Sequence, residues 1–296
     1  MTIQIGKHIG SIDPYKPGKP LEELERELGI KGAIKLASNE NPLGPSKKAL
    51  AVLKKGMAGL HRYPEGSGRR VREAIAQKYK LEPEQVILGN GSDEIMDLAA
   101  KTFLEPGSEA ITGDLTFAIY PICVTAHHGI SVRVPLRDGR YDLEAMAARL
   151  TPLTRLVFLC NPNNPTGTMI SRRELDRFLG RLPSNVLVVM DEAYAEYADD
   201  PEFPDTIDDV RRGAPVLVLR TFSKMYGLAG LRIGYGLSTP NAVEAMNRVR
   251  LPFNTNSLAQ AAAIAALSDE AHRVKSLRMN REGRRYLSES FETLGL

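Results

Sequence analysis

A lysine lies among hydroxyl side chains directly after an apolar run of the sequence. Lys224 follows PVLVLR at 215–220, with Thr221 and Ser223 beside it and Arg232 eight residues further on. Most lysines stay solvated at the surface, but the carboxyl end of a strand is where α/β folds bind their ligands. The two hydroxyls can donate hydrogen bonds to a phosphate, and the arginine can supply the matching charge. This spacing indicates a phosphate-bearing ligand next to a lysine amine.

A carboxylate ends a second apolar run. In VVMDEAYAEY, Asp191 follows the aliphatic residues and Tyr194 comes three residues later. An isolated aspartate more often caps a helix or pairs with a surface arginine. At the end of a strand, however, a carboxylate can hold a heterocyclic nitrogen protonated, which turns the ring into an electron sink. Asp191 is therefore a candidate for activating a ring-shaped cofactor.

Three shorter segments supply groups that could complete such a site. LCNPNNPTG at 159–167 is rich in turn residues, and its Asn163 and Asn164 amides could bond a ligand oxygen. LGNGSDEIM predicts a helix beginning near Ser92, and glycines before a helix N-terminus favour anions. It lacks the GxGxxG and GK[ST] patterns, so NAD or ATP binding is not predicted. Phe117 could stack on a flat ring, although an aromatic residue at this spacing is more often part of the core.

The elements that must position these residues are short apolar runs separated by helical patterns. Helices are predicted near 94–104, 143–150 and 174–182, the last opened by a Ser171-x-x-Glu174 capping box. Alternation of this kind favours a mostly parallel α/β sheet. Seven strands are predicted, at 86–88, 110–112, 130–134, 155–160, 185–190, 215–220 and 232–237.

Helical patterns dominate both ends of the sequence. LEELERELGI places three leucines at helical spacing, and further helices are predicted near 46–57 and 69–79. The segment 257–296 is almost entirely helical in pattern and contains no further strand. The strands are therefore confined to the middle of the chain.

Composition excludes several classes of function. Of the 296 residues, 39 are basic and 36 acidic, which is too balanced for a nucleic-acid footprint. Cys123 and Cys160 have no metal-ligand spacing, so no metal site is predicted, and two cysteines fit a reducing compartment. No apolar run approaches the roughly 20 residues that a bilayer span needs. We expect a cytoplasmic protein without nucleic-acid or membrane partners.

The motifs, taken in their order, resemble the pyridoxal-phosphate (PLP) aminotransferases of fold type I, and most closely the histidinol-phosphate aminotransferase subgroup. The resemblance covers nearly the whole chain, and NPNNPTG with a later DEAY and SK-x(7)-R is highly specific in combination. It implies a large PLP-binding domain at 34–265. Residues 1–33 would form an arm and helix of a small domain, and 266–296 a connecting helix. The motifs are PYKPGKP, LASNENPLGP, RYPEG, GNGSDEI, NPNNPTG, DEAY and TFSKMYGLAGLRIGYG.

The resemblance also implies a role for each matching residue. Lys224 would hold PLP as a Schiff base and act as general acid and base, and Asp191 would face the pyridine nitrogen. Asn164 and Tyr194 would bond the phenolic oxygen of the ring, with Phe117 stacked on its face. Asn39 and Tyr15 would lie near the substrate. A homodimer with a shared site is implied as well, and the phosphate would be bound by Ser92, Asp93, Thr221, Ser223, Arg232 and, from the second subunit, Tyr63.

The resemblance breaks off at Leu296. Members of the family continue with a further small-domain segment that carries an arginine for the α-carboxylate of the substrate, and no arginine here matches it. We therefore expect a chain shortened at its C-terminal end, with an incomplete small domain. The implied reaction is transamination of L-histidinol phosphate with 2-oxoglutarate. An aromatic amino-acid aminotransferase, a related decarboxylase of a phosphorylated amino acid and an inactive cofactor-binding fragment are the alternatives.

Overall fold

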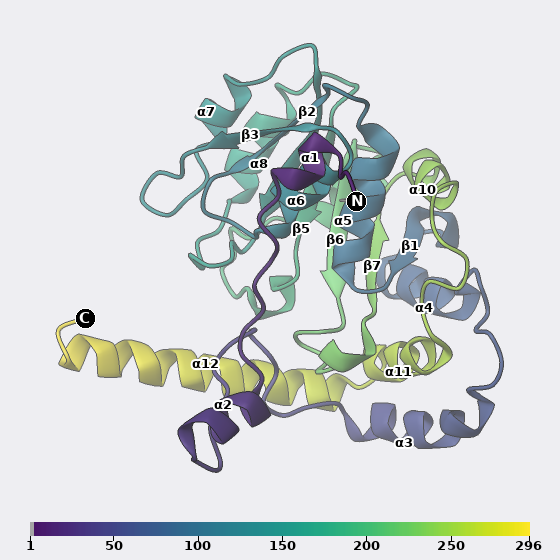
Figure 1. Cartoon of the computed structure of the whole chain (residues 1–296), viewed down its shortest axis with the longest axis vertical. Coiled ribbons are helices and arrows are strands. Elements are labelled where there is room, and N and C mark those ends of the chain that lie inside the picture. The colour runs from purple at the N-terminus through teal and green to yellow at the C-terminus, as the bar shows by residue number, and fades with distance from the viewer. Residues whose placement is uncertain (1–2) are drawn as a thin grey trace.

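A seven-stranded sheet forms the centre of the protein (Figure 1). The structure is a computed structural model and describes residues 3–296. The strand order is β1-β7-β6-β5-β4-β2-β3, and only β7 runs against its neighbours. The predicted mostly parallel sheet of seven strands is confirmed. The strands are β1 (Val86–Gly89), β2 (Glu109–Gly113), β3 (Ile130–Val134), β4 (Thr154–Cys160), β5 (Leu187–Asp191), β6 (Val216–Thr221) and β7 (Gly234–Leu237).

Helices cover both faces of the sheet, which explains why its central strands are apolar on both sides. Every residue of β5 is buried, for example. One face packs on α5 (Ser92–Phe103), α6 (Ile119–Ala126) and α10 (Pro240–Asn247). The opposite face packs on helices that include α3 (Lys47–Gly56), α4 (Arg69–Tyr79), α7 (Leu143–Ala147), α8 (Arg172–Leu179), α9 (Thr206–Arg211) and α11 (Ser257–Leu267).

Several predicted bounds shift in the structure. The capping box at Ser171 is present, but it starts α8 two residues before the predicted helix. The last strand was predicted from residue 232, yet β7 starts at Gly234, because Arg232 has a left-handed φ of 53° that ends the preceding turn. Four helices were not predicted from the sequence: α6, α9, α10 and the short α1 (Lys7–Gly10). In α6 the apolar run has no helical period, and Pro121 is tolerated because it lies in the first turn.

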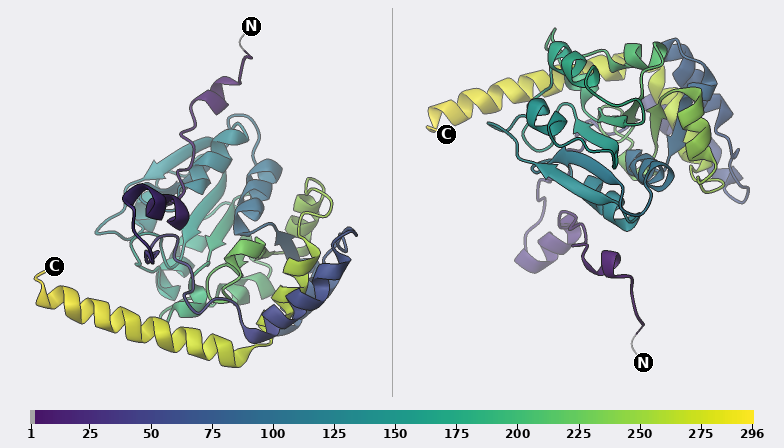
Figure 2. Two further views of the ribbon diagram at one scale, coloured as in Figure 1. Left: turned by 60° about the horizontal axis from the view of Figure 1, so that its bottom comes forward. Right: turned by 90° about the horizontal axis from the view of Figure 1, so that it is seen from above.

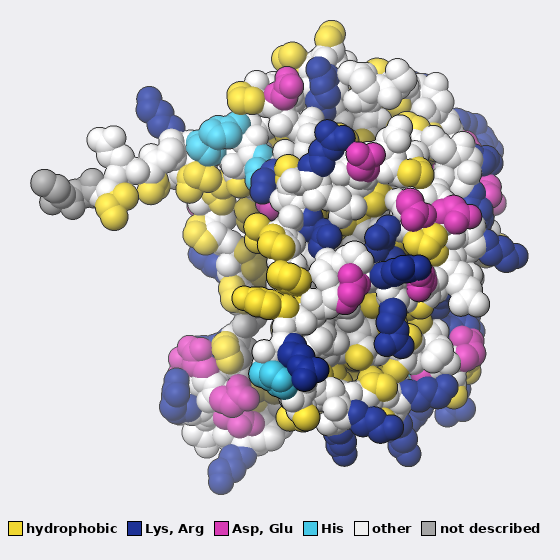
Figure 3. Space-filling model, turned by 90° about the vertical axis from the view of Figure 1, so that its right-hand side faces the viewer, with side chains coloured by type: hydrophobic (Ala, Val, Ile, Leu, Met, Phe, Trp, Pro, Cys, Tyr) yellow, Lys and Arg dark blue, Asp and Glu magenta, His cyan; other side chains and the backbone are white. Residues whose placement is uncertain are grey.

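The two ends of the chain lie along the outside of the sheet domain. The N-terminal arm runs past the sheet and leads into α2 (Leu21–Leu28), and it projects from the body in Figure 2. Figure 3 shows a hollow between this arm and the α2 segment. The long helix α12 (Glu270–Thr293) extends beyond the sheet domain, and Ser276 is its one buried residue. Within residues 3–296, no helix is both long and apolar enough to cross a bilayer.

Candidate active site

A cavity of about 250 Å³ lies where the carboxyl ends of β4, β5 and β6 meet the N-terminus of α5. Because neighbouring parallel strands end at one edge, the segments that follow them converge there. Of the residues predicted for the site, Tyr63 and Asn163 are absent from the cavity wall. The wall contains Tyr15, Asn39, Ser92, Asp93, Phe117, Asn164, Asp191, Tyr194, Thr221, Ser223, Lys224 and Arg232, together with Ser38, Ile119, Cys160 and Ala193.

The carboxylate of Asp191 is buried at the base of this cavity, with 3% of the residue exposed. Desolvation raises the pKa of Asp191 to about 6, opposed by hydrogen bonds from the Tyr120 hydroxyl and the Ala193 amide. These bonds measure 2.7 Å to Oδ2 and 3.2 Å to Oδ1. A buried carboxylate of this kind is stabilised by a neighbouring cation. The position therefore fits a protonated heterocyclic nitrogen.

Lys224 lines the cavity and differs from a solvent-exposed lysine in its contacts and in its pKa. Its Nζ donates a hydrogen bond of 2.7 Å to the carbonyl of Ser38 and lies 5.6 Å from the ring centre of Tyr194. Burial lowers the pKa of Lys224, although Asp93, Glu40 and Asp191 oppose this. A lowered pKa increases the fraction of neutral amine, which is the nucleophilic form. Lys224 is thus suited to attack a carbonyl group.

The loop that carries Ser38 has a strained backbone. Ser38 and Asn39 both have left-handed φ values, of 68° and 48°. Such conformations cost on the order of 1 kcal/mol or more for residues other than glycine, and they cluster at ligand sites. Here they direct the Ser38 carbonyl to Lys224 and the Asn39 amide to Tyr194.

Two amides converge on one phenol in the cavity. Tyr194 Oη accepts hydrogen bonds from Asn39 Nδ2 at 3.0 Å and from Asn164 Nδ2 at 3.4 Å. Together these groups can bind an oxygen on a ring. Asn163, considered for the same purpose, is used by the turn itself: its Nδ2 donates to the carbonyl of Leu115 at 3.1 Å. The amide of Asn163 therefore maintains the loop, and that expectation is corrected.

The other end of the cavity is suited to an anion. Ser92 begins α5, and its helix N-terminus favours negative charge. The guanidinium of Arg232 lies 3.2 Å from the carboxylate of Asp93. The packing is possible because of two glycines: a Cβ on Gly91 would lie 2.4 Å from Arg232 Nη2, and one on Gly234 would lie 2.6 Å from the Ser92 amide nitrogen. Thr221 and Ser223 complete this end of the wall.

Tyr63 is not part of this cavity. Its side chain is 82% exposed and stacks on Phe253 at 4.7 Å between ring centres. The predicted contribution of Tyr63 from a second subunit is not tested by a single chain and stays a prediction.

Two larger cavities share lining residues with this one. A cavity of about 630 Å³ shares Tyr15 and Phe117 with it, between the N-terminal arm and the body. Another of about 430 Å³ shares Asn39, Asn164 and Tyr194 and reaches α12. Both provide space for a substrate beside the central cavity. Over the described part of the chain, no group of acidic, histidine and cysteine side chains is arranged to hold a metal ion.

Sequence patterns missed some residues at the site. Tyr120 was not singled out, because the helix α6 that carries it was not predicted. Ser38 contributes its backbone carbonyl, which has no signature in the residue type. Cys160, noted only for its lack of metal-ligand spacing, lines the cavity as the last residue of β4.

The chain matches one protein family over most of its length. The profile of the class I and II aminotransferases matches residues 31–295. A histidinol-phosphate aminotransferase of Moorella thermoacetica is 52% identical over 289 residues, covering 97% of this chain and 75% of the relative. One of Anaeromyxobacter sp. is 49% identical, with coverage of 97% and 79%.

A solved structure agrees with the sequence relatives. Histidinol-phosphate aminotransferase from Sinorhizobium meliloti, in complex with pyridoxal 5′-phosphate, superposes with a TM-score of 0.88 at 30% identity. The match covers 97% of this chain and 77% of that one. The likeness therefore extends from the sequence to the arrangement of the whole sheet and its helices.

Proposed function

The chain belongs to the class I and II aminotransferase family, and on that premise we propose that it transfers an amino group from L-histidinol phosphate to 2-oxoglutarate with PLP as cofactor. Relatives that are 52% and 49% identical carry the name of this activity. The observation that carries the proposal is the single cavity in which a lysine amine, a buried carboxylate and an anion-binding end face one another. An aromatic amino-acid aminotransferase would use the same cofactor residues and is the second candidate.

The groups around the cavity match the parts of PLP. Lys224 would attach the cofactor through its amine, and Asp191 would lie at the ring nitrogen. Asn164 and Tyr194 would bind the phenolic oxygen, with Phe117 stacked on the ring. The phosphate would be bound by Ser92, Asp93, Thr221, Ser223 and Arg232. When bound, PLP supplies an electron sink for the reaction at the amino carbon of the substrate.

The side chains of this protein have separate tasks in that reaction. Asp191 supplies a buried negative charge, since its hydrogen bonds from Tyr120 and Ala193 stabilise the ionised form. Lys224 is the one amine among the residues that line the cavity, and it can take up or release a proton at Nζ because burial lowers its pKa. Asn39 and Tyr15 lie where the cavity meets the larger ones and would contact the substrate.

A homodimer belongs to the same proposal. Tyr63 is exposed and lies outside the cavity of its own chain, which is consistent with a contribution to the site of a second subunit. A cytoplasmic location likewise stays a prediction from the cysteine usage of the sequence.

Attachment of the cofactor to Lys224 can be tested directly. The purified protein is mixed with PLP, reduced with borohydride, digested and examined by mass spectrometry. The PLP adduct is expected on Lys224 and absent in Lys224→Ala. Lys78→Ala is a matched control, because desolvation also lowers the pKa of Lys78, which bonds Tyr226 and lies outside the cavity wall. An adduct that is absent from the wild-type protein, or found elsewhere, contradicts the proposal.

Substrate choice needs a second experiment. Single-turnover reactions of the PLP-loaded protein with histidinol phosphate, phenylalanine and glutamate compare the candidates under one condition. We expect the fastest amino transfer from histidinol phosphate. Faster transfer from phenylalanine would favour the aromatic alternative, and PLP binding without any transfer would favour an inactive cofactor-binding protein.

A further inference from the structure

Tyr120 connects two walls of the cavity without lining it. The residue is fully buried in α6, and its hydroxyl donates a 2.7 Å hydrogen bond to Oδ2 of Asp191. Its ring meets Phe117 edge-on, with 5.7 Å between centres and 81° between planes. On its other side it stacks on Phe158 of β4, at 5.1 Å and 15°. One side chain thus contacts both the carboxylate and the aromatic ring that face the cavity.

The contacts of Tyr120 restrict each partner in a different way. Phe158 is fully buried in the sheet, so the stacked ring of Tyr120 has a fixed support. Burial raises the pKa of Tyr120 well above its usual range, which keeps the hydroxyl protonated and able to donate. An edge-on aromatic contact is weak, but it defines the direction of the Phe117 ring.

We propose that Tyr120 is a positioning residue, which orients and helps to ionise Asp191 while it supports Phe117 against the cofactor ring. This inference rests on the proposed function, because it assigns the two partners to PLP. Tyr120 itself has no contact with the cavity, so its effect passes through Asp191 and Phe117.

The hydrogen bond has a consequence that depends on pH. It stabilises the charged form of Asp191 and opposes the desolvation that raises the pKa of Asp191 to about 6. Without the hydroxyl, the pKa of Asp191 is higher still, and more of the carboxyl group is protonated near neutral pH. A protonated carboxyl group must release its proton before it can balance a pyridinium charge, which weakens PLP binding most at low pH.

The first test compares PLP affinity in Tyr120→Phe with that of the wild-type protein between pH 6 and 8. Loss of the hydrogen bond is expected to raise the dissociation constant about tenfold at pH 7, with a difference that grows toward pH 6. Tyr235→Phe is the matched control, because Tyr235 is also fully buried and bonds Tyr79 Oη at 2.8 Å on the opposite face of the sheet. The control is expected to bind PLP as the wild-type protein does.

Two outcomes overturn the proposal. One is a Tyr120→Phe protein with wild-type affinity across the pH range, and the other is an equal loss in Tyr235→Phe.

A measurement without PLP separates this inference from the proposed function. Titration of ¹³C-labelled aspartate carboxyl groups by NMR reports the pKa of Asp191 in the protein alone, with Asp191→Asn used to assign the signal. The Tyr120→Phe protein is expected to show a higher pKa than the wild type. An unchanged pKa refutes the role of Tyr120, whereas failure of the wild-type protein to bind PLP refutes the proposed function.

Discussion

The buried carboxylate of Asp191 destabilises the fold while it prepares a site for a cation. It is 3% exposed and lies at the end of a fully buried strand, so its ionised form loses most of its hydration. No cationic side chain on the cavity wall forms an ion pair with Asp191. The hydrogen bonds to its carboxylate come from a hydroxyl and an amide. A bound cationic ring would supply the positive charge that no side chain of the cavity wall places next to Asp191.

Replacement of Asp191 by asparagine is therefore expected to stabilise the protein in the absence of PLP. The folded pKa of about 6 lies above the ordinary value of 3.8, so the folded state takes up a proton more readily than the unfolded chain. The favourable contribution of the protonated group is complete below about pH 3.8 and is lost as the pH rises through 6. At pH 7 the substitution should increase the free energy of unfolding by about 3 kcal/mol.

Urea unfolding at pH 4 and pH 7 measures this effect. The gain should be present at pH 7 and nearly absent at pH 4, and PLP affinity should fall. Asp209→Asn is a control of opposite sign, because Asp209 is buried but paired with Arg172 at 2.6 Å. Removal of one partner of a buried pair destabilises. A loss of stability in Asp191→Asn at pH 7 would contradict the argument.

Residue types that follow strands were predictable, whereas contacts made through the backbone were not. Lys224, Asp191 and Asn164 each follow an apolar run, so their convergence could be expected from the sequence. Ser38 was missed because its backbone carbonyl, not its side chain, contacts Lys224. The residue type does not indicate the left-handed turn that directs this carbonyl. Tyr120 was missed because its helix has no amphipathic period.

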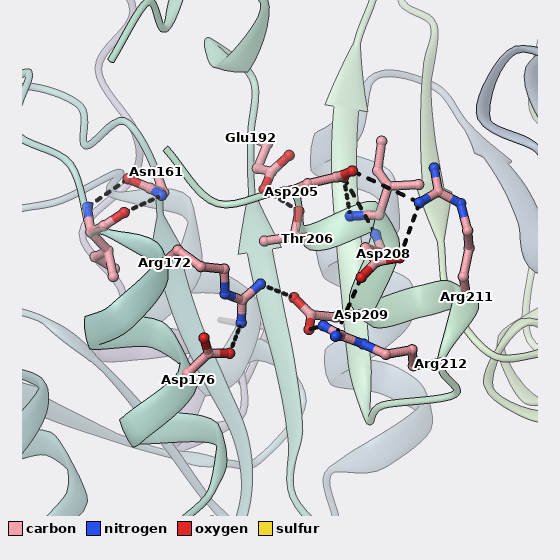
Figure 4. A network of polar contacts seen from close by, with 12 residues as sticks. Asn161, Arg172, Asp176, Glu192, Asp205, Thr206, Asp208, Asp209, Arg211 and Arg212 are labelled. Atoms are coloured by element: carbon pink, nitrogen blue, oxygen red, sulfur yellow. Dashed lines mark hydrogen bonds and ion pairs between the residues drawn. The ribbon is translucent and has the colours of Figure 1, made fainter. Parts of the chain in front are cut away.

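At the scale of elements, an ion pair joins the ends of β5 and β6 under the site. Glu192 is fully buried and accepts a 2.9 Å hydrogen bond from Arg220 Nε. Figure 4 shows Glu192 bonded to Thr206 of α9 as well. Side chains alternate between the faces of a sheet, so this pair lies on one face while Asp191 and Thr221 lie on the other. The pair thus holds together the two strands from which much of the site projects.

Arg220→Met should leave the Glu192 carboxylate buried and unpaired. We expect a loss on the order of 3–5 kcal/mol in the free energy of unfolding, measured in urea, together with weaker PLP binding. Arg172→Met provides the comparison, because Arg172 also pairs with a buried carboxylate, that of Asp209, between α8 and α9 (Figure 4). It should lose stability but retain PLP affinity. Equal PLP affinity in both variants would show that the ion pair of Glu192 and Arg220 does not affect PLP binding.

Gly234→Ala tests the close approach of β7 to α5. The added Cβ would lie 2.6 Å from the Ser92 amide nitrogen, a backbone atom that cannot move aside cheaply. The helix N-terminus must shift, so PLP affinity is expected to fall at least tenfold while the protein stays folded, by equilibrium dialysis and circular dichroism. Gly283→Ala in α12 has no atom within 4 Å of its Cβ and should retain PLP affinity. Unchanged affinity in Gly234→Ala would show that α5 tolerates the shift.

The order of strands and helices was largely predictable, because each strand is a short apolar run that helices bury on both faces. The first and last residues of the strands and helices were less predictable. The last strand begins at Gly234 rather than at residue 232, because the left-handed φ of Arg232 depends on its turn. The apolar period gives no information about such a turn.

At the scale of the whole molecule, the proposed dimer would complete each site with a residue from the second subunit. Tyr63 is exposed in the single chain, and the long α12 leaves Tyr286, Leu287 and Phe291 exposed. The predicted division into 1–33, 34–265 and 266–296 stays a prediction at this scale.

Mixing two defective variants tests the shared site. Lys224→Ala lacks the amine, and Tyr63→Leu lacks the phenol that a partner would receive. A hybrid dimer of the two would contain one site with both residues intact, so amino transfer should reappear after subunit exchange. Sedimentation measures the dimer in parallel. If dimers form but mixing restores nothing, Tyr63 does not act across the interface.

The antiparallel direction of strand β7 determines how the amine of Lys224 and the guanidinium of Arg232 are connected along the chain. Two adjacent parallel strands need a crossover of roughly a dozen residues or more, usually a helix, that carries the chain back to the opposite edge. Because β7 is antiparallel to β6, the chain turns back at once, and Lys224 and Arg232 stay on the same edge in one short connection. The spacing between Lys224 and Arg232 is therefore set by local chain geometry, and an insertion in this connection would lengthen it directly.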